Sequence, residues 1–127
     1  MNEITVKIIG CAYKVSNTLG IGYVEKVCEN ALAVLSRKSG LLIEQQYPIK
    51  VIFEGVDVGE FFADPSVEER ILVELKAVSM LAQKHTAQAL NYLRATGAKV
   101  CLLINFGRSK IEIKRLLPSV YWKTLKS

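Results

Sequence analysis

The sequence lacks the features that mark membrane, secreted and zinc-binding proteins. It has three cysteines, one histidine and one tryptophan among 127 residues. Cys11, Cys28 and Cys101 are far apart and odd in number, so neither a disulfide framework nor a zinc site built on CxxC pairs is expected. No apolar run approaches the roughly 18 residues that span a bilayer, and the N-terminus lacks the basic start and apolar block of a signal peptide. We therefore expect a cytoplasmic protein with reduced, buried thiols and no membrane partner.

Glycine and proline are also scarce, with 8 and 3 residues, whereas half of the chain is apolar and 23% is charged. This composition is typical of folded globular proteins and not of disordered ones. A chain of this length can bury a core of its own. We expect a single domain over residues 1–127.

Acidic residues are nearly absent from the C-terminal part of the chain. Residues 1–74 contain 7 Lys/Arg and 11 Asp/Glu, a net charge of −4, whereas residues 75–127 contain 10 Lys/Arg and only Glu112, a net charge of +9. A basic region of this size suits a polyanion such as nucleic acid, which it would steer toward the carboxylates of the first part. A basic surface that only maintains solubility explains the charge equally well.

Hydrophobic periodicity predicts three helices and five strands. The apolar period is helical before Gly20, Gly40 and Gly97, and it changes to two in the strands. The expected helices cover residues 3–19, 23–39 and 83–96, and the expected strands cover about 49–53, 58–64, 71–78, 100–106 and 110–116. We interpret residues 65–70 as a polar connection, and the tail 118–127 is ambiguous. A meander of three strands, a crossover helix and a returning strand imply an α/β (α+β) fold with helices packed on a mixed sheet.

The third predicted strand carries two charges within an otherwise apolar segment. Side chains alternate between the faces of a strand, so Glu74 and Lys76 share one face. Burying such charges is costly unless they are paired or bind a metal ion. The same Glu-x-Lys spacing recurs at Glu112 and Lys114, but no aspartate follows Asp64 in the sequence. We interpret this second copy as part of a solvated edge strand.

Asp64 ends the preceding predicted strand, ten residues before Glu74. A hairpin turning at about residues 66–70 would bring the two carboxylates together, and a hard divalent cation would relieve their repulsion. Such a cation can polarise a phosphoryl oxygen and lower the pKa of a bound water molecule, while Lys76 orients the water or stabilises developing charge. Oxygen ligands favour Mg²⁺ or Mn²⁺ over zinc. This is a phosphodiester-cleaving arrangement.

Further polar residues are candidates for the same site, each with a structural alternative. Glu25 opens the second predicted helix, where the helix dipole also favours a carboxylate. Gln88 and Tyr92 are four residues apart and share a face of the third helix, which also fits an ordinary, partly buried surface. His85 is the only histidine, and a structural role suits it better than that of a general base.

The combined pattern resembles the GxxExxY proteins of the PD-(D/E)XK nuclease superfamily. The likeness extends over about residues 4–116, nearly the whole chain. Five separated segments carry it in the right order: Gly22–Leu32, Phe62–Asp64, Ile71–Ala77, Ala87–Gly97 and Leu102–Gly107. The resemblance implies a restriction-endonuclease-like αβββαβ core that hydrolyses phosphodiester bonds in DNA or RNA.

The resemblance also implies roles for single residues. Lys76 corresponds to the catalytic lysine, and Gln88 with Tyr92 resembles a Gln-x-x-x-Tyr element whose glutamine helps to order the active site. The implied catalytic residues are Asp64, Glu74, Lys76, Glu25 and Gln88. The implied ligands of the Mg²⁺ or Mn²⁺ ion are Asp64, Glu74 and Leu75.

Five positions depart from the family pattern. Cys28 stands in place of the tyrosine that names the family, and a thiol cannot donate a phenolic hydrogen bond. Phe62 replaces a usual basic residue, and Thr86 replaces a usual glutamate. Pro65–Ser66 replaces an apolar pair, and proline fits a strand poorly except at an edge or a bulge, so the orientation of the preceding aspartate could differ.

The leading hypothesis from the sequence is a metal-dependent nuclease. Two alternatives keep the fold without catalysis. One is a nucleic-acid-binding module, which Cys28, Pro65 and the basic second part of the chain favour. The other is a protein-interaction or scaffold role, for which Tyr121 and Trp122 leave room for a homo-oligomer.

Overall fold

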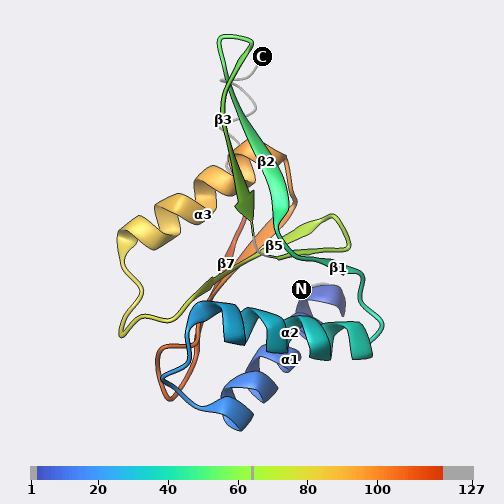
Figure 1. The fold of residues 1–127 in the computed structure, drawn as a ribbon, viewed down its shortest axis with the longest axis vertical. Coiled ribbons are helices and arrows are strands. Elements are labelled where there is room, and N and C mark those ends of the chain that lie inside the picture. Colours follow the sequence, from blue (N-terminus) through green and yellow to red (C-terminus); the bar gives the residue numbers. More distant parts are fainter. Residues whose placement is uncertain (1–2, 64, 119–127) are drawn as a thin grey trace.

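The computed structural model describes residues 3–63 and 65–118 (Figure 1). Asp64 and residues 119–127, which include Tyr121 and Trp122, lie outside the described residues. The helices are α1 (Glu3–Leu19), α2 (Glu25–Lys38) and α3 (Gln83–Thr96). The strands are β1 (Ile43–Glu44), β2 (Tyr47–Phe53), β3 (Val56–Ala63), β4 (Ser66–Val67), β5 (Ile71–Lys76), β6 (Val100–Asn105) and β7 (Glu112–Leu116).

Glycines end α1 and α3, and both helices have the predicted bounds. Gly20 and Gly97 adopt the left-handed backbone conformation (φ 73° and 72°), and each N–H donates to the carbonyl four residues earlier at 2.9 Å. α2 begins at Glu25 and not at residue 23, because Val24 is still extended (φ −72°, ψ 158°). Glu25 is thus the first residue of α2, where the helix dipole favours a carboxylate.

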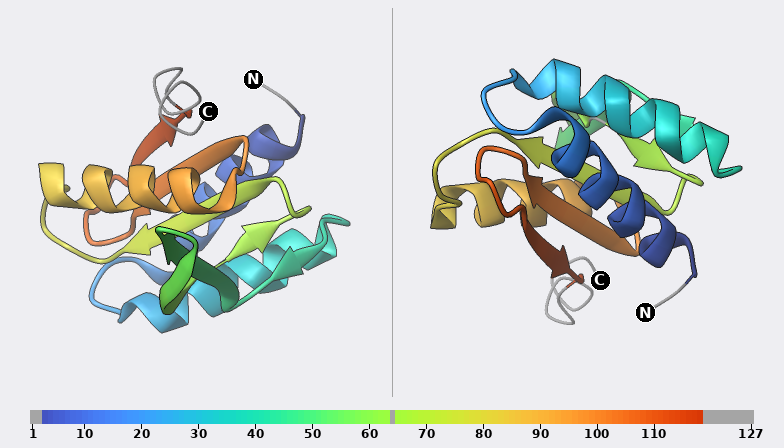
Figure 2. Two further views of the ribbon diagram at one scale, coloured as in Figure 1. Left: turned by 90° about the horizontal axis from the view of Figure 1, so that it is seen from above. Right: turned by 90° about the horizontal axis from the view of Figure 1, so that it is seen from below.

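Five strands form one mixed sheet in the order β1-β4-β5-β6-β7. β5 and β6 are parallel, with Lys76 opposite Asn105, and the other neighbouring pairs are antiparallel. Figure 2 shows α1 and α2 on one face of this sheet and α3, the crossover between β5 and β6, on the other. The expected fold class, an α/β (α+β) arrangement with helices on a mixed sheet, is confirmed.

The expected meander of three strands is wrong, because β3 does not pair with β5. β2 and β3 form a separate two-stranded sheet, and the short β4 lies beside β5 instead. Residues 65–70 are therefore not simply a polar connection, since Ser66 and Val67 are buried. A hairpin does turn at the expected place, with Glu68 and Glu69 at positive φ, but it joins β4 and not β3 to β5. β1 and β4 escaped prediction because two-residue strands show no periodicity.

The hairpin of β2 and β3, residues 47–63, projects from the body of the molecule, and we call it the arm (Figure 1). Ile49 at its base is buried against residues of α3. Farther along, Ile52 and Phe53 are exposed, and the strand register shifts between Val51 and Ile52. The arm therefore stands beside α3 and does not extend the five-stranded sheet.

Two apolar clusters hold the helices to the sheet. The larger cluster lies under α1 and α2 and includes Val73, Leu75 and Leu102. The smaller cluster lies under α3 and includes Leu72 and Cys101. All three cysteines are free and buried, as expected. Within the described part of the chain, no helix combines the length and the apolar character needed to cross a membrane.

We expect Leu102→Ala to lower the free energy of unfolding by about 3 kcal/mol, because the truncation leaves a cavity in the middle of the sheet. Leu102 is fully buried, whereas Leu42 is 65% exposed and provides the control. Leu42→Ala should change the free energy by no more than about 0.5 kcal/mol. Urea unfolding followed by circular dichroism measures both, and equal losses would contradict this packing.

Candidate active site

β5 places Glu74 and Lys76 on the face of the sheet that α3 covers. Ile71, Val73 and Leu75 belong to the cluster under α1 and α2, so the alternation of the strand directs the two charged side chains the other way. Lys76 Nζ lies 3.9 Å from Glu74 Oε1, and the two side chains are only 16% and 13% exposed. Attraction within such a pair offsets its desolvation cost only in part. Its presence on an apolar strand therefore favours a functional role.

The neighbouring thiol of Cys101 responds to this environment. Burial raises the pKa of Cys101 to about 12, and the negative charge of Glu74 adds to the rise. A thiol with such a pKa stays protonated and is a poor nucleophile. Cys101 therefore forms an inert, apolar boundary of the site.

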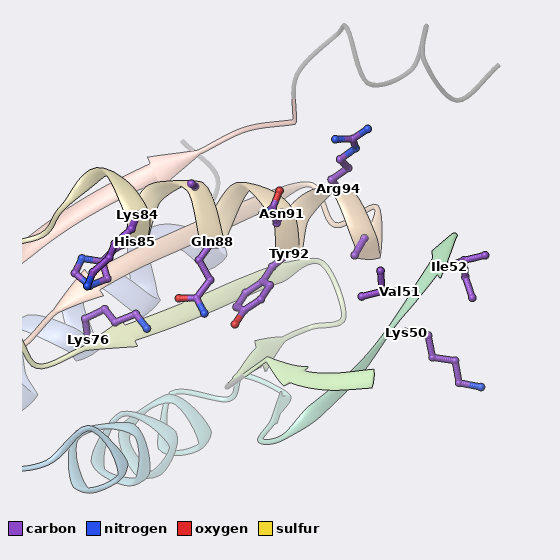
Figure 3. A pocket seen from close by; sticks show the side chains of 12 residues that line it. Lys50, Val51, Ile52, Lys76, Lys84, His85, Gln88, Asn91, Tyr92 and Arg94 are labelled. Atoms are coloured by element: carbon purple, nitrogen blue, oxygen red, sulfur yellow. The ribbon is translucent and has the colours of Figure 1, made fainter. Parts of the chain in front are cut away.

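Lys76 extends into an open cleft of about 1260 Å³ between α3 and the arm (Figure 3). α3 forms one wall of this cleft, and residues 50–52 of β2 form the other. The cationic side chains that line it are Lys50, Lys76, Lys84 and Arg94, and none of its described lining residues is a carboxylate. A cleft with this charge attracts a polyanion.

Gln88 and Tyr92 share the cleft-facing side of α3, as their spacing predicts. Figure 3 shows both side chains extending from α3 toward the sheet, with Gln88 next to Lys76. Gln88 is exposed to the cleft, whereas Tyr92 is half-buried and packs against the smaller cluster. The glutamine amide is thus placed to contact the lysine or a bound phosphate.

His85 has a structural contact at the start of α3. Its Nδ1 accepts a hydrogen bond from the Ala82 N–H at 2.9 Å. A ring nitrogen that accepts carries no hydrogen, so the neutral ring has its hydrogen on Nε2. This contact agrees with the structural interpretation of the only histidine.

Glu25 lies in a different hollow from Lys76. The second hollow, of about 900 Å³, is formed by the start of α2 and by residues that follow β5, among them Ala77 and Val78. The structure therefore brings Lys76 and Gln88 into one cleft with Glu74 beside them. It places Glu25 in the adjoining hollow, beyond the end of β5.

A buried acid on α2 was not singled out from the sequence. Glu29 follows Glu25 by one helical turn and lines the same hollow. Its carboxylate accepts hydrogen bonds from Lys26 Nζ at 3.3 and 3.4 Å and from the amide of Gln45. These contacts tie the loop before β2 to α2. The i, i+4 spacing from Glu25 was the available sequence signal.

A sequence profile of the PD-(D/E)XK nuclease superfamily matches residues 2–116. The chain belongs to the PD-(D/E)XK nuclease superfamily. No curated protein and no solved structure matches the chain. The mixed sheet with its flanking helices is consistent with the restriction-endonuclease-like fold of this superfamily. Its nucleases act on nucleic acid and generally use divalent metal ions.

The chemistry of a PD-(D/E)XK protein depends on the oxygen atoms that could hold such an ion. Of the ligands expected from the sequence, Glu74 and Leu75 are described and Asp64 is not. Within residues 3–63 and 65–118, no three His, Cys, Asp or Glu side chains are grouped closely enough to hold an ion. Among the described residues, the expected metal ligands are therefore the Glu74 carboxylate and the Leu75 backbone carbonyl. Both are hard oxygen donors that suit Mg²⁺ or Mn²⁺.

The backbone of β5 directs the Leu75 carbonyl away from β6. Val73 N–H donates to the Pro65 carbonyl on the β4 side at 2.8 Å, and the Lys76 carbonyl accepts from Phe106 N–H on the β6 side at 2.8 Å. Backbone groups of successive strand residues point to opposite sides, so those of Leu75 point to the β4 side, as those of Val73 do. The β4–β5 pairing covers only residues 66–67 and 71–72. The Leu75 carbonyl therefore points to the β4 side, past the described pairing of β4 with β5.

The structure shows the surroundings of two residues that depart from the family pattern, Cys28 and Pro65. Cys28 is buried in the larger cluster, and burial, followed by the charge of Glu25, raises the pKa of its thiol. It fills space but offers no strong donor. Pro65 is buried just before the start of β4, and without an N–H it cannot return the hydrogen bond that Val73 donates to it.

The second Glu-x-Lys copy is more than a solvated edge strand. β7 is an edge strand, as expected, but Glu112 Oε1 accepts hydrogen bonds from Asn105 Nδ2 (2.9 Å) and from Leu81 N–H (3.3 Å). Lys114 Nζ donates to Thr86 Oγ1 at 3.5 Å. Glu112 of this second copy therefore has a structural function.

Asn105 links that glutamate to the chain that leaves β5. Its Oδ1 accepts from the N–H groups of Val78 (3.0 Å) and Gly107 (2.9 Å), and its Nδ2 also donates to the Val78 carbonyl (2.9 Å). Gly107 packs directly on the backbone of Val78. We call Asn105, Gly107 and Glu112 the exit clamp, because they hold the chain two residues after Lys76.

We expect Gly107→Ala to destabilise the protein by about 1–3 kcal/mol, because the added methyl group would overlap the backbone N and O atoms of Val78. Gly59→Ala is the control, since nothing lies within 4 Å of the position of its added methyl group. Thermal unfolding measures both variants. A Gly107→Ala protein as stable as the Gly59→Ala protein would contradict the close approach.

We expect Glu112 to contribute stability that is lost in acid. The hydrogen bond from Asn105 lowers the pKa of Glu112, so its folded-state pKa lies below its unfolded-state pKa. Its contribution is complete above the unfolded value of about 4.3 and disappears as the pH falls through the lowered folded value. The melting-temperature difference between the wild type and Glu112→Gln should therefore shrink as the pH is lowered from about 6 to 3. Glu44→Gln, on an exposed residue of β1, is the control, and an equal trend there would contradict the assignment.

Proposed function

We propose that the chain is a metal-dependent nuclease that hydrolyses phosphodiester bonds in DNA or RNA, and that it belongs to the GxxExxY branch of its superfamily. The observation that carries the proposal is the largely buried Glu74–Lys76 pair beside a cationic cleft. The segment Gly22–Leu32 and the Gln88/Tyr92 pair on α3 support the assignment to the branch. The fold alone would fit many activities, so the proposal depends on this pair of side chains.

The metal site that we propose consists of Glu74, the Leu75 carbonyl and Asp64. Asp64 is covalently bonded to Pro65, whose carbonyl is hydrogen-bonded to Val73, the residue before Glu74. This link between Asp64 and the backbone next to Glu74 supports the inclusion of Asp64 in the metal site. A bound Mg²⁺ or Mn²⁺ ion supplies polarisation of a phosphoryl oxygen and a lowered pKa of bound water.

Lys76 supplies positive charge next to the phosphate that is to be cleaved. Its ammonium group has three hydrogen-bond donors, and the attraction of Glu74 Oε1 at 3.9 Å restricts its position. From there it can orient the attacking water or stabilise the charge that develops on the phosphate. Gln88, next to Lys76 in Figure 3, can hold the ammonium group or a phosphate oxygen through its amide.

Glu25 is proposed as an additional acid of the site. It lies beyond the end of β5, in the hollow next to Ala77 and Val78. From this position it would act where the substrate or its ions pass the end of β5.

We also propose a cytoplasmic location, because three free, buried thiols suit a reducing compartment.

We expect Lys76→Ala to lower the rate of metal-dependent cleavage by about a hundredfold or more, because it removes a charge that stabilises the transition state. Glu74→Gln should abolish cleavage by removing a metal ligand. Lys114→Ala is a matched control from the second Glu-x-Lys copy, and its rate should stay within about twofold of the wild type. Labelled single- and double-stranded DNA and RNA, incubated with Mg²⁺ or Mn²⁺ and analysed on denaturing gels, give the rates.

Cleavage that survives Glu74→Gln would assign the activity to another site or to a contaminant. Absence of metal-dependent cleavage for all four polymers would reject the nuclease. Binding of nucleic acid with a steep salt dependence would then point to the non-catalytic binding module.

A further inference from the structure

The cleft between α3 and the arm has two chemically different walls. The α3 wall carries the cations Lys84 and Arg94 at its two ends, with polar side chains between them. The arm wall consists of Lys50, Val51 and Ile52, so two of its three residues are apolar, and Ile52 is 58% exposed. A ligand that fits both walls has one anionic side and one apolar side.

The acidic residues of the arm do not line the cleft. Glu54 lies in the turn at the tip, and Asp57 and Glu60 are exposed on β3. Glu60 is opposite Lys50 in the strand register, so it offsets part of the lysine charge. The arm therefore contributes mainly an apolar surface to the cleft, and most of the positive charge comes from Lys84 and Arg94 of α3 and from Lys76 of β5.

The volume and length of the cleft suit a short segment of a polymer. Its volume of about 1260 Å³ is somewhat larger than the roughly 300–1,000 Å³ of pockets for small molecules. The α3 wall from Lys84 to Arg94 is about 15 Å long at 1.5 Å per residue. A duplex, by contrast, needs a protein surface of roughly 600–2,500 Å² for specific binding.

We propose that this cleft binds single-stranded nucleic acid, with phosphates toward the cations of α3 and bases against Val51 and Ile52. A single strand exposes both its phosphates and the faces of its bases, whereas a duplex stacks its bases inside. The inference rests on the proposed nuclease function, because Lys76 lines the same cleft. It adds the class of substrate and the surface that selects it.

The arm wall is tested by two matched substitutions in the same hairpin. Ile52 lines the cleft and Val58 does not, and both are β-branched residues with 58% exposure. Ile52→Asp should weaken binding of a single strand by about tenfold, since it removes a base contact, whereas Val58→Asp adds the same charge and should change it by less than about twofold. Fluorescence anisotropy with labelled oligothymidylate, oligouridylate and a DNA duplex of about 12 nucleotides, in EDTA to prevent cleavage, measures the affinities.

The α3 wall is tested by salt dependence. Lys84→Ala should reduce the slope of log K against log salt concentration by about 0.7, the value for one phosphate contact with a single strand. Lys110→Ala, on an exposed lysine outside the cleft, should leave the slope unchanged. Both lysines are exposed, so this comparison also holds if an arm variant fails to fold.

The wild type should bind at least one of the single strands about tenfold more tightly than the duplex. Equal affinity for the duplex, or equal effects of Ile52→Asp and Val58→Asp, would overturn the inference. Single-strand binding with this pattern but no metal-dependent cleavage would reject the nuclease alone. Cleavage of duplex without any preference for single strands would reject the cleft inference alone.

Discussion

Two opposite charges share one face of β5, a strand that is apolar at its other positions and packed by helices on both sides of the sheet. Glu74 and Lys76 are kept there by their mutual attraction, since either charge alone would be far more costly to bury. The rest of the site follows from this pair. α3 crosses over the same face and brings Gln88 next to Lys76, and the arm leaves the cleft above them open.

The elements around β5 differ in how firmly they are held. The exit clamp uses a fully buried amide, Asn105, with three hydrogen-bonded partners in the loops at the end of the sheet. It therefore defines where the chain turns after Lys76 and where α3 begins. The arm is held mainly at its base through Ile49 and is exposed beyond it. A firmly held strand that carries the proposed catalytic residues, beside a lightly held arm, suits a site through which a polymer passes.

The sequence predicted which candidate residues share a face, but not how they are divided between the cleft and the neighbouring hollow. The shared face of Glu74 and Lys76 follows from strand alternation, and that of Gln88 and Tyr92 follows from helical spacing. Glu25 was expected in the same group, yet it lies in a neighbouring hollow. The placement of α2 against the end of β5 depends on packing between distant segments, which local spacing does not contain.

The sequence by itself determined the bounds of α1 and α3 and the shared face of the two charges on β5, because each depends on neighbours within a few residues. Only the tertiary structure decided that β4 and not β3 lies beside β5, that the β2–β3 hairpin stands apart as an arm, and that Glu112 belongs to the exit clamp. These features depend on which strands and side chains meet across long stretches of chain. Such contacts are selected by the burial of the whole core, and a local pattern of apolar residues is compatible with several of them.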